Sequence, residues 1–239
     1  MNPPCRSRTP GSQGYPAKIV SAGASPDLTI ARAVLKRSSV SACAVLFGIM
    51  FLGRDCLAQD LWSASALAPA PPNGVLLFAG QFTTVDITRS LIPTAPHETN
   101  YIAGGAYGRD FFQKWGFALG TEIGAAERFG MGSSFEGWAG LNVRYTAFVF
   151  LNTVRIIPGI TVGFSAITRP VGIEAEREAA AQGNARLLGY LGPELAVSFV
   201  NFPNLEFVYR LQHRSGAGGT FGKLSDTANA NVFGLRFRF

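Results

Sequence analysis

Strict alternation of apolar residues with small or charged ones runs through most of this chain, and it constrains the fold more than any other feature. From Lys114 to Arg128 the odd positions hold apolar residues such as Trp115 and Ile123. The even positions hold small residues and Glu122. A period of two is the signature of a β-strand, whose successive side chains point to opposite faces. One face of this strand is therefore apolar, and the other is small or charged.

Eight segments carry this pattern. An even number of strands, joined by connections that alternate between short and long, predicts an all-β fold: an eight-stranded antiparallel transmembrane β-barrel. A soluble β-sandwich or a lipocalin-like barrel is the alternative. The candidate strands are 75–81, 101–109, 114–128, 135–147, 154–164, 187–199, 204–212 and 231–239. Short turns are expected near 110–113, 150–152 and 201–203, and long loops over 86–97, 168–184 and 214–228.

The first 58 residues are predicted to be a leader. Arg32, Lys36 and Arg37 precede an apolar run over 40–52, and a small residue, Ala58, follows it. The run is well short of the roughly 20 residues that a spanning helix needs. We therefore expect a secretory signal peptide with a long N-terminal extension over 1–58. A short linker rich in Pro and Ala follows over 59–72, and an outer-membrane barrel over 73–239.

Cleavage of the leader changes the charge and the cysteine content. Seven of the 21 Lys and Arg residues and two of the 15 Asp and Glu residues precede Gln59, which leaves 14 positive and 13 negative charges. A nearly neutral chain argues against a nucleic-acid partner. Cys5, Cys43 and Cys56 also lie in the leader, so the mature chain would lack thiols. No metal-ligand set, phosphate-binding glycine loop or dinucleotide motif is visible, so we expect no metal and no cofactor.

The charged face of the strands predicts the contents of the barrel. Side chains can fill the interior of an eight-stranded barrel. We expect the charges on this face to neutralise one another and close the lumen. Acid–base catalysis by lumenal carboxylates, or a porin function, would lack a route for the substrate. The residues concerned are Glu122, Glu136, Arg144, Arg155, Glu194, Glu206, Arg210 and Arg236.

Two side chains that could take part in catalysis follow the seventh candidate strand. Its apolar positions up to Leu211 share the lipid-facing parity, which His213 and Ser215 continue. Side chains two residues apart on one side of a strand have Cβ atoms roughly 6–7 Å apart, so an imidazole can reach a hydroxyl. Such a pair can act as a general base and a nucleophile. Gly216 and Gly218 free nearby backbone N–H groups for an oxyanion hole.

The segment from His213 to Ala217 resembles the His-x-Ser-Asn-Ala signature of the lipid A 3-O-deacylases, which are eight-stranded outer-membrane esterases. Beyond this segment and the final strand, the resemblance is one of architecture over roughly residues 74–239. It implies that His213 is the general base and Ser215 the nucleophile. The family has a Glu about a dozen residues after the Ser, and Asp226 is the matching carboxylate here.

Two departures from the family pattern affect the expected site. Gly216 stands where the family has Asn, and Asp226 stands where it has Glu. An Asp can orient and charge-stabilise an imidazole if the loop brings it about one methylene closer. Asn229 could supply the side-chain donor that Gly216 lacks.

The resemblance implies hydrolysis of an ester-linked 3-hydroxyacyl chain of lipid A, with lipopolysaccharide as the partner molecule. The rival class is a non-catalytic barrel that serves as an adhesin or an envelope-structural protein, with loop 168–184 as its binding surface. His97 lies in an early loop and is expected to be exposed. Which acyl chain is removed, whether a homodimer forms and where the true start codon lies stay open.

Overall fold

The structure is a computed structural model that describes residues 62–63, 70–92 and 94–239. The predicted leader and most of the predicted linker lie outside these residues. None of the helices in the described ranges has the length and apolar character needed to span a bilayer.

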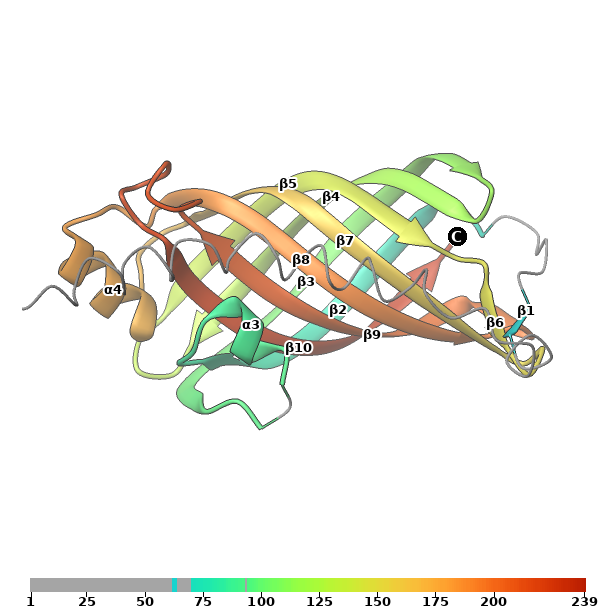
Figure 1. Cartoon of the computed structure of the whole chain (residues 1–239), viewed down its shortest axis with the longest axis horizontal. Coiled ribbons are helices and arrows are strands. Elements are labelled where there is room, and N and C mark those ends of the chain that lie inside the picture. Colours follow the sequence, from blue (N-terminus) through green and yellow to red (C-terminus); the bar gives the residue numbers. More distant parts are fainter. Residues whose placement is uncertain (1–61, 64–69, 93) are drawn as a thin grey trace, which may run out of the picture. The chain divides into compact units, whose positions relative to one another are not determined.

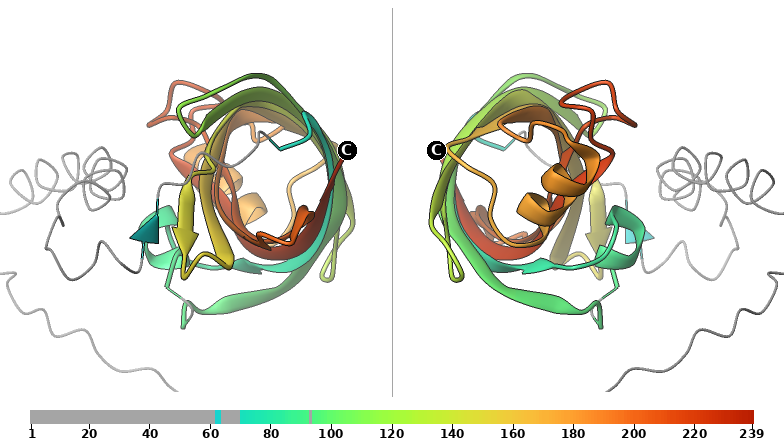
Figure 2. Two further views of the ribbon diagram at one scale, coloured as in Figure 1. Left: turned by 90° about the vertical axis from the view of Figure 1, so that its right-hand side faces the viewer. Right: turned by 90° about the vertical axis from the view of Figure 1, so that its left-hand side faces the viewer.

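Eight long strands in the described part of the chain form one closed antiparallel sheet (Figures 1 and 2). Each strand pairs with the next in sequence order, and the ring closes where β10 pairs with β2. The prediction of an eight-stranded barrel is therefore confirmed. The strands are β2 (Asn73–Thr83), β3 (His97–Lys114), β4 (Phe117–Phe129), β5 (Ser134–Tyr145), β7 (Val154–Ile167), β8 (Leu187–Phe199), β9 (Phe202–Ser215) and β10 (Asp226–Arg238).

Shorter elements lie at the two ends of the barrel. β6 (Phe148–Phe150) pairs with the start of β7, and β1 (Trp62–Ser63) pairs with β6. At the opposite end, α3 (Ile87–Ser90) lies between β2 and β3, and α4 (Ile173–Ala181) lies between β7 and β8 (Figure 1). The long connections therefore gather at one end, which we call the loop end.

One predicted turn is wrong. The sequence pattern placed a turn near 110–113, but β3 continues to Lys114 through a bulge that follows Asp110. The turn lies at Trp115 and Gly116, whose φ angles are 56° and 81°. Positive φ at both central residues is the geometry of a type I′ hairpin turn. Asp110 remains in the sheet, where its carboxylate pairs with buried Arg238.

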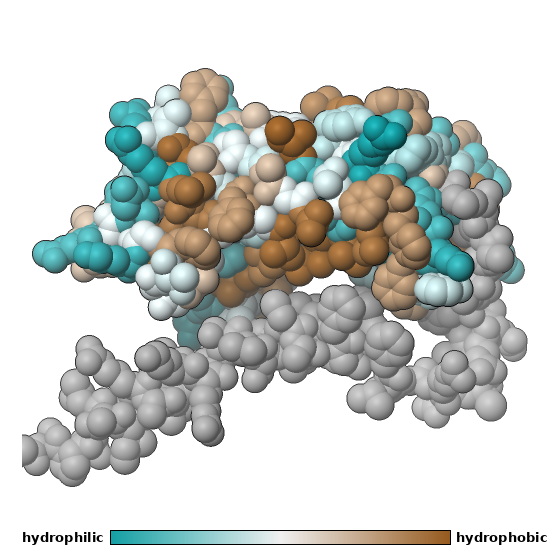
Figure 3. Space-filling model, turned by 90° about the horizontal axis from the view of Figure 1, so that it is seen from above, coloured by the Kyte–Doolittle hydropathy of each residue, from teal (hydrophilic) through white to brown (hydrophobic). Residues whose placement is uncertain are grey.

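The outer surface of the barrel is apolar. Large side chains at alternating positions are exposed, including Leu77 at 66%, Ile123 at 61% and Phe207 at 52%. Figure 3 shows apolar side chains across the middle of one face, with hydrophilic residues gathered toward the ends. A band of this kind is stable against lipid, whereas in water it would be an aggregation site. The protein is therefore an outer-membrane β-barrel.

Charged side chains that pair with one another fill the lumen. Glu194 lies 2.6 Å from Arg210, 2.7 Å from Arg236 and 3.3 Å from Arg144. Arg210 also donates two hydrogen bonds to Glu122, at 2.6 and 2.7 Å. All of these residues are buried. The expected mutual neutralisation is thus observed for these residues, whereas Arg155 of the expected set is buried and forms no salt bridge with any described residue.

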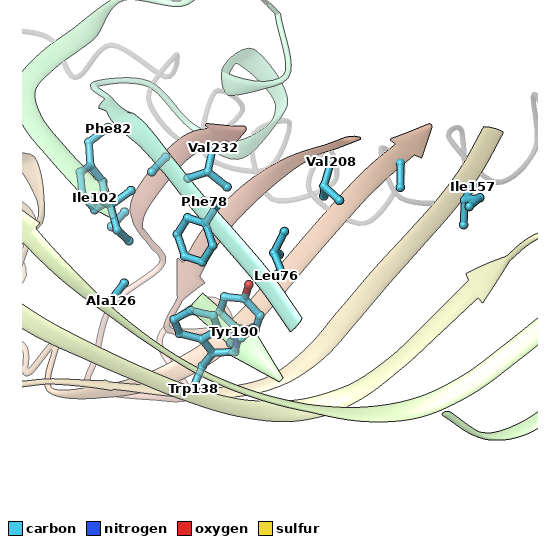
Figure 4. Packing of buried hydrophobic residues seen from close by; sticks show 14 residues of the cluster. Leu76, Phe78, Phe82, Ile102, Ala126, Trp138, Ile157, Tyr190, Val208 and Val232 are labelled. Atoms are coloured by element: carbon cyan, nitrogen blue, oxygen red, sulfur yellow. The ribbon is translucent and has the colours of Figure 1, made fainter. Parts of the chain in front are cut away.

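Buried aromatic rings also lie inside the barrel, as part of the hydrophobic cluster in Figure 4. The rings of Trp138 and Tyr190 are stacked with their centroids 5.6 Å apart, and Phe78 lies 5.9 Å from Trp138. The Trp138 indole Nε1 donates to Glu122 at 3.0 Å. The apolar core and the ion pairs therefore share one lumen.

We predict that Glu194→Gln strongly destabilises the barrel. The substitution leaves three buried guanidinium groups short of a negative charge, and breaking a buried pair costs about 3–5 kcal/mol. Urea-induced unfolding in liposomes, followed by tryptophan fluorescence, measures the change. Glu127→Gln is the matched control, because Glu127 is exposed on the outer side of β4, and we expect it to change the free energy of unfolding by less than about 0.5 kcal/mol. Equal stability of the two variants would contradict the assigned role of the network.

Candidate functional site

β9 places a histidine and a serine at the loop end. Along this strand Arg210 and Arg214 point into the lumen, where Arg214 pairs with Glu174 of α4. His213 and Ser215 take the opposite parity, so their side chains leave the strand on its outer side. The structure therefore places both residues on the face that the sequence pattern assigned to them.

His213 faces Asn229 across the pair of strands β9 and β10. The two residues are directly opposite each other, and the imidazole Nδ1 lies 2.6 Å from Asn229 Oδ1. Asp226 Oδ1 is 3.8 Å from the same nitrogen, which is too far for a hydrogen bond. The expected base and acid are thus neighbours, but the imidazole bonds to the amide and not to the carboxylate.

The Asp226 carboxylate connects three loops. Its Oδ2 accepts a hydrogen bond from the Ile87 backbone N–H at 2.8 Å, and its Oδ1 accepts one from Asn229 Nδ2 at 3.0 Å. Arg177 of α4 lies 3.4 Å from Oδ1 and donates to the Thr227 carbonyl at 3.0 Å. Arg177 and Ile87 carry no signal in the sequence, because the alternation of the strands does not indicate which loop residues meet.

The loop between β2 and β3 covers the imidazole. Asn229 Nδ2 donates to the Val85 carbonyl at 2.8 Å, and the hydroxyl groups of Thr83 and Ser90 are 2.6 Å apart. His213 is only 5% exposed. The expectation that His213 looks out into lipid is therefore wrong: the side chain points outward but lies beneath a loop. Buried polar groups need polar partners, and this loop supplies backbone and hydroxyl groups.

Asp86 holds the first turn of α3 as its N-cap. Its carboxylate accepts from the backbone N–H groups of Thr88 and Arg89 at 3.0 and 3.1 Å, as N-cap residues do. Partial burial raises the pKa of the Asp86 carboxyl, but hydrogen bonds from Thr88 and Arg89 outweigh it and hold the pKa below its usual value. The cap is therefore ionised at neutral pH.

The Ser215 hydroxyl is engaged by its own loop. Ser215 Oγ donates to the Ser225 carbonyl at 2.9 Å and accepts from the Ala217 N–H at 3.1 Å. Its proton is therefore not directed to His213 in this conformation. Both partners belong to the connection between β9 and β10, so a change of the Ser215 rotamer is enough to release the hydroxyl.

The donors expected to form an oxyanion hole are only partly available. The Gly216 N–H donates to the Ser225 carbonyl at 2.8 Å, and Asn229 Nδ2 donates to both Val85 and Asp226. These commitments remove Gly216 and Asn229 as oxyanion donors in this conformation. Gly218, with φ +68° and open space around it, has no partner for its N–H among the described residues. It is the expected donor that stays free.

The cluster offers acid–base groups and no metal-binding set. In the ranges that the structure describes, no group of three or more His, Cys, Asp or Glu side chains could hold a metal ion. The cluster combines the imidazole of His213, the hydroxyl of Ser215 and the carboxylate of Asp226 on two adjacent strands.

No protein-family profile matches the sequence, and no curated protein is similar to it. Among solved structures, the chain is similar to Neisserial surface protein A, with 12% identity over 72% of this chain and 100% of that one and a TM-score of 0.46. It is similar to the outer membrane enzyme PagL, with 13% identity over 70% and 99% of the two chains and a TM-score of 0.43. It is also similar to Ail, the attachment invasion locus protein of Yersinia pestis, with 10% identity over 72% and 100% and a TM-score of 0.37. At identities this low, the activity has to be argued from the residues of this chain.

We predict that Ile87→Pro exposes His213. Proline suits the first position of a helix, and the extended backbone of Asp86 suits a residue before proline, so the substitution removes little except the N–H that binds Asp226. Loss of a charge-assisted hydrogen bond worth about 1.5 kcal/mol should speed modification of His213 by diethyl pyrocarbonate about 10-fold. Mass spectrometry separates His213 from exposed His97. Ile87→Ala keeps the N–H and should react like the wild type; equal rates for the two variants would contradict the prediction.

Proposed function

We propose that this barrel is an outer-membrane esterase that removes an ester-linked 3-hydroxyacyl chain from lipid A. Ser215 is the nucleophile, His213 is the general base and Asp226 stabilises the imidazolium that forms. One observation carries the proposal. On the outer side of the barrel, the Asn229 amide of β10 joins the His213 imidazole to the Asp226 carboxylate. Ser215 lies two residues after His213 on β9.

The reaction follows from the roles of these groups. His213 takes the proton of Ser215, whose Oγ attacks the ester carbonyl, and the sugar oxygen leaves with the proton that His213 returns. Water then attacks the acyl-serine with the same base and releases the fatty acid. The Ala217 N–H, already 3.1 Å from Ser215 Oγ, and the free Gly218 N–H are the backbone donors at hand for the oxyanion.

Two local changes precede the reaction. Ser215 Oγ gives up its hydrogen bond to the Ser225 carbonyl, which costs about 0.5–1.5 kcal/mol. The loop that carries α3 moves aside, because the imidazole it covers is only 5% exposed. Loop movements of this kind are a common step before chemistry in hydrolases with covered sites, and the cost of the first change is small beside a chemical barrier.

The position of the cluster favours lipid A as the substrate. The cluster lies on the outside of the barrel at the loop end, on the same strand face that carries exposed apolar side chains such as Phe207 nearer the middle of β9. Lipid A fills the outer leaflet, and its ester groups lie where the sugars meet the acyl chains. In this proposal, a lipid that diffuses laterally along the belt brings its ester to Ser215, with its acyl chain against apolar side chains.

A non-catalytic role as an adhesin or an envelope-structural protein is the second candidate. The Ser215 hydroxyl is bonded to its own loop and the imidazole is covered, an arrangement that would also suit a cluster that only anchors loops. The loop that contains α4 would then carry the contact with a partner.

We predict that expression of the wild-type chain shortens lipid A by one 3-hydroxyacyl group, which mass spectrometry of extracted lipid A detects. Ser215→Ala should lower the turnover by at least about 10³-fold, since it removes the nucleophile. Ser225→Ala is the matched control: its exposed side chain is lost, while the backbone carbonyl that accepts from Ser215 stays. Identical mass spectra of lipid A from cells with and without the folded wild-type protein would contradict the esterase proposal and favour the non-catalytic role.

A further inference from the structure

We infer that Asn229, and not Asp226, orients His213, and that it holds the neutral imidazole in the tautomer with the proton on Nδ1. Asp226 helps to position the imidazole only through Asn229. The consequence for turnover rests on the proposed esterase function, whereas the tautomer can be tested without it.

The hydrogen bonds of Asn229 determine which way its amide group faces. Nδ2 lies 2.8 Å from the Val85 carbonyl oxygen and 3.0 Å from Asp226 Oδ1. A backbone carbonyl only accepts hydrogen bonds, so the NH₂ group must face Val85. The reversed amide would set Oδ1 against two acceptors and would lose both bonds. Asn229 Oδ1 therefore faces His213.

This orientation settles the tautomer of His213. An oxygen that only accepts, 2.6 Å from Nδ1, requires a proton on Nδ1. A neutral imidazole carries one ring proton, so Nε2 keeps its lone pair. Among the described residues Nε2 has no hydrogen-bond partner. It is therefore the nitrogen that can accept the proton of a nucleophile.

Asp226 supports this arrangement from behind. Its Oδ1 is 3.8 Å from His213 Nδ1, so it does not select the tautomer directly. It accepts from Asn229 Nδ2 and fixes the amide, while Ile87 and Arg177 fix the carboxylate in turn. Its negative charge still lies near enough to stabilise the imidazolium. The Asp226 side chain is 23% exposed against 6% for His213, so water weakens this charge interaction.

Nuclear magnetic resonance tests the inference directly, because the chain has two histidines and His97→Gln leaves only His213. The refolded barrel, labelled with ¹⁵N-histidine in detergent micelles, reports the tautomer in long-range ¹H–¹⁵N spectra recorded above the titration of the imidazole. We expect the Nδ1–H tautomer in this background. It should persist in Asp226→Asn, where an amide oxygen still accepts from Asn229. It should give way to a mixture in Asn229→Leu.

Matched variants keep the test decisive. Leu is close to Asn in size and cannot bond the imidazole, and Asn229→Ala is the smaller alternative if the leucine variant does not fold. The shift in gel mobility on heating verifies folding of each variant. Asn231→Leu is the control, because Asn231 shares the outward parity of β10 but bonds Tyr209 at 2.9 Å. A tautomer unchanged in Asn229→Leu or Asn229→Ala, or lost in Asp226→Asn alone, would overturn the inference.

The lipid A assay adds the catalytic readout. Asn229→Leu should lower turnover by at least about 10-fold, the effect of losing a supporting hydrogen-bond partner. The loss should reach about 10⁴-fold if the wrong tautomer dominates. Asp226→Asn should lower it less, and Asn231→Leu should leave it unchanged. If the nuclear magnetic resonance spectra are as expected but the wild type does not deacylate lipid A, the esterase proposal is rejected. The orientation of His213 by Asn229 then still stands. Full deacylation by folded Asn229→Leu would reject the role of Asn229 in turnover.

Discussion

The buried ion pairs of the lumen are the constraint on which the rest of the structure depends. A charge taken out of water costs several kcal/mol unless it is paired. Closing eight strands into a ring brings Arg210 of β9 within reach of Glu122 of β4, on the opposite side of the barrel. An open sheet would leave these two groups apart, whereas Glu206 and Arg236 already face each other on adjacent strands. Because the paired side chains occupy the interior, the proposed chemistry has to lie on the outer face at the loop end.

Arg214 connects this interior to the candidate site. It lies between His213 and Ser215 on β9, but its guanidinium is buried in the lumen, where it pairs with Glu174 and donates to the Ala185 carbonyl at 2.7 Å. These bonds keep the end of β9 in strand geometry, so its neighbours in sequence must point outward. Glu174 and Arg177 share helix α4, so one short helix contacts both the lumenal network and the Asp226 carboxylate.

The sequence predicts the barrel well and the site only in part, for one physical reason. Alternation has a period that follows directly from strand geometry, so 187–199 was predicted with the bounds that the structure has, and His213 and Ser215 were assigned to the correct face. The turn at Trp115 was missed because an apolar residue there continued the alternation. Contacts between loops have no period, so neither the cover over His213 nor the bond from Ile87 to Asp226 could be predicted from the spacing of residues.

A row of polar side chains points outward at the loop end, where a purely structural barrel has no need of polar groups. Thr83, Asn229 and His213 lie side by side on the lipid-facing parity of β2, β10 and β9, where apolar residues would avoid the cost of burying polar groups. The loop with α3 offsets this cost by bonding the row through Val85 and Ser90. Removing that cover exposes an imidazole whose Nδ1 is already held by an amide and whose other nitrogen is unoccupied among the described residues. The closed arrangement satisfies the hydrogen bonds of these polar groups, and the proposed esterase would need it to open.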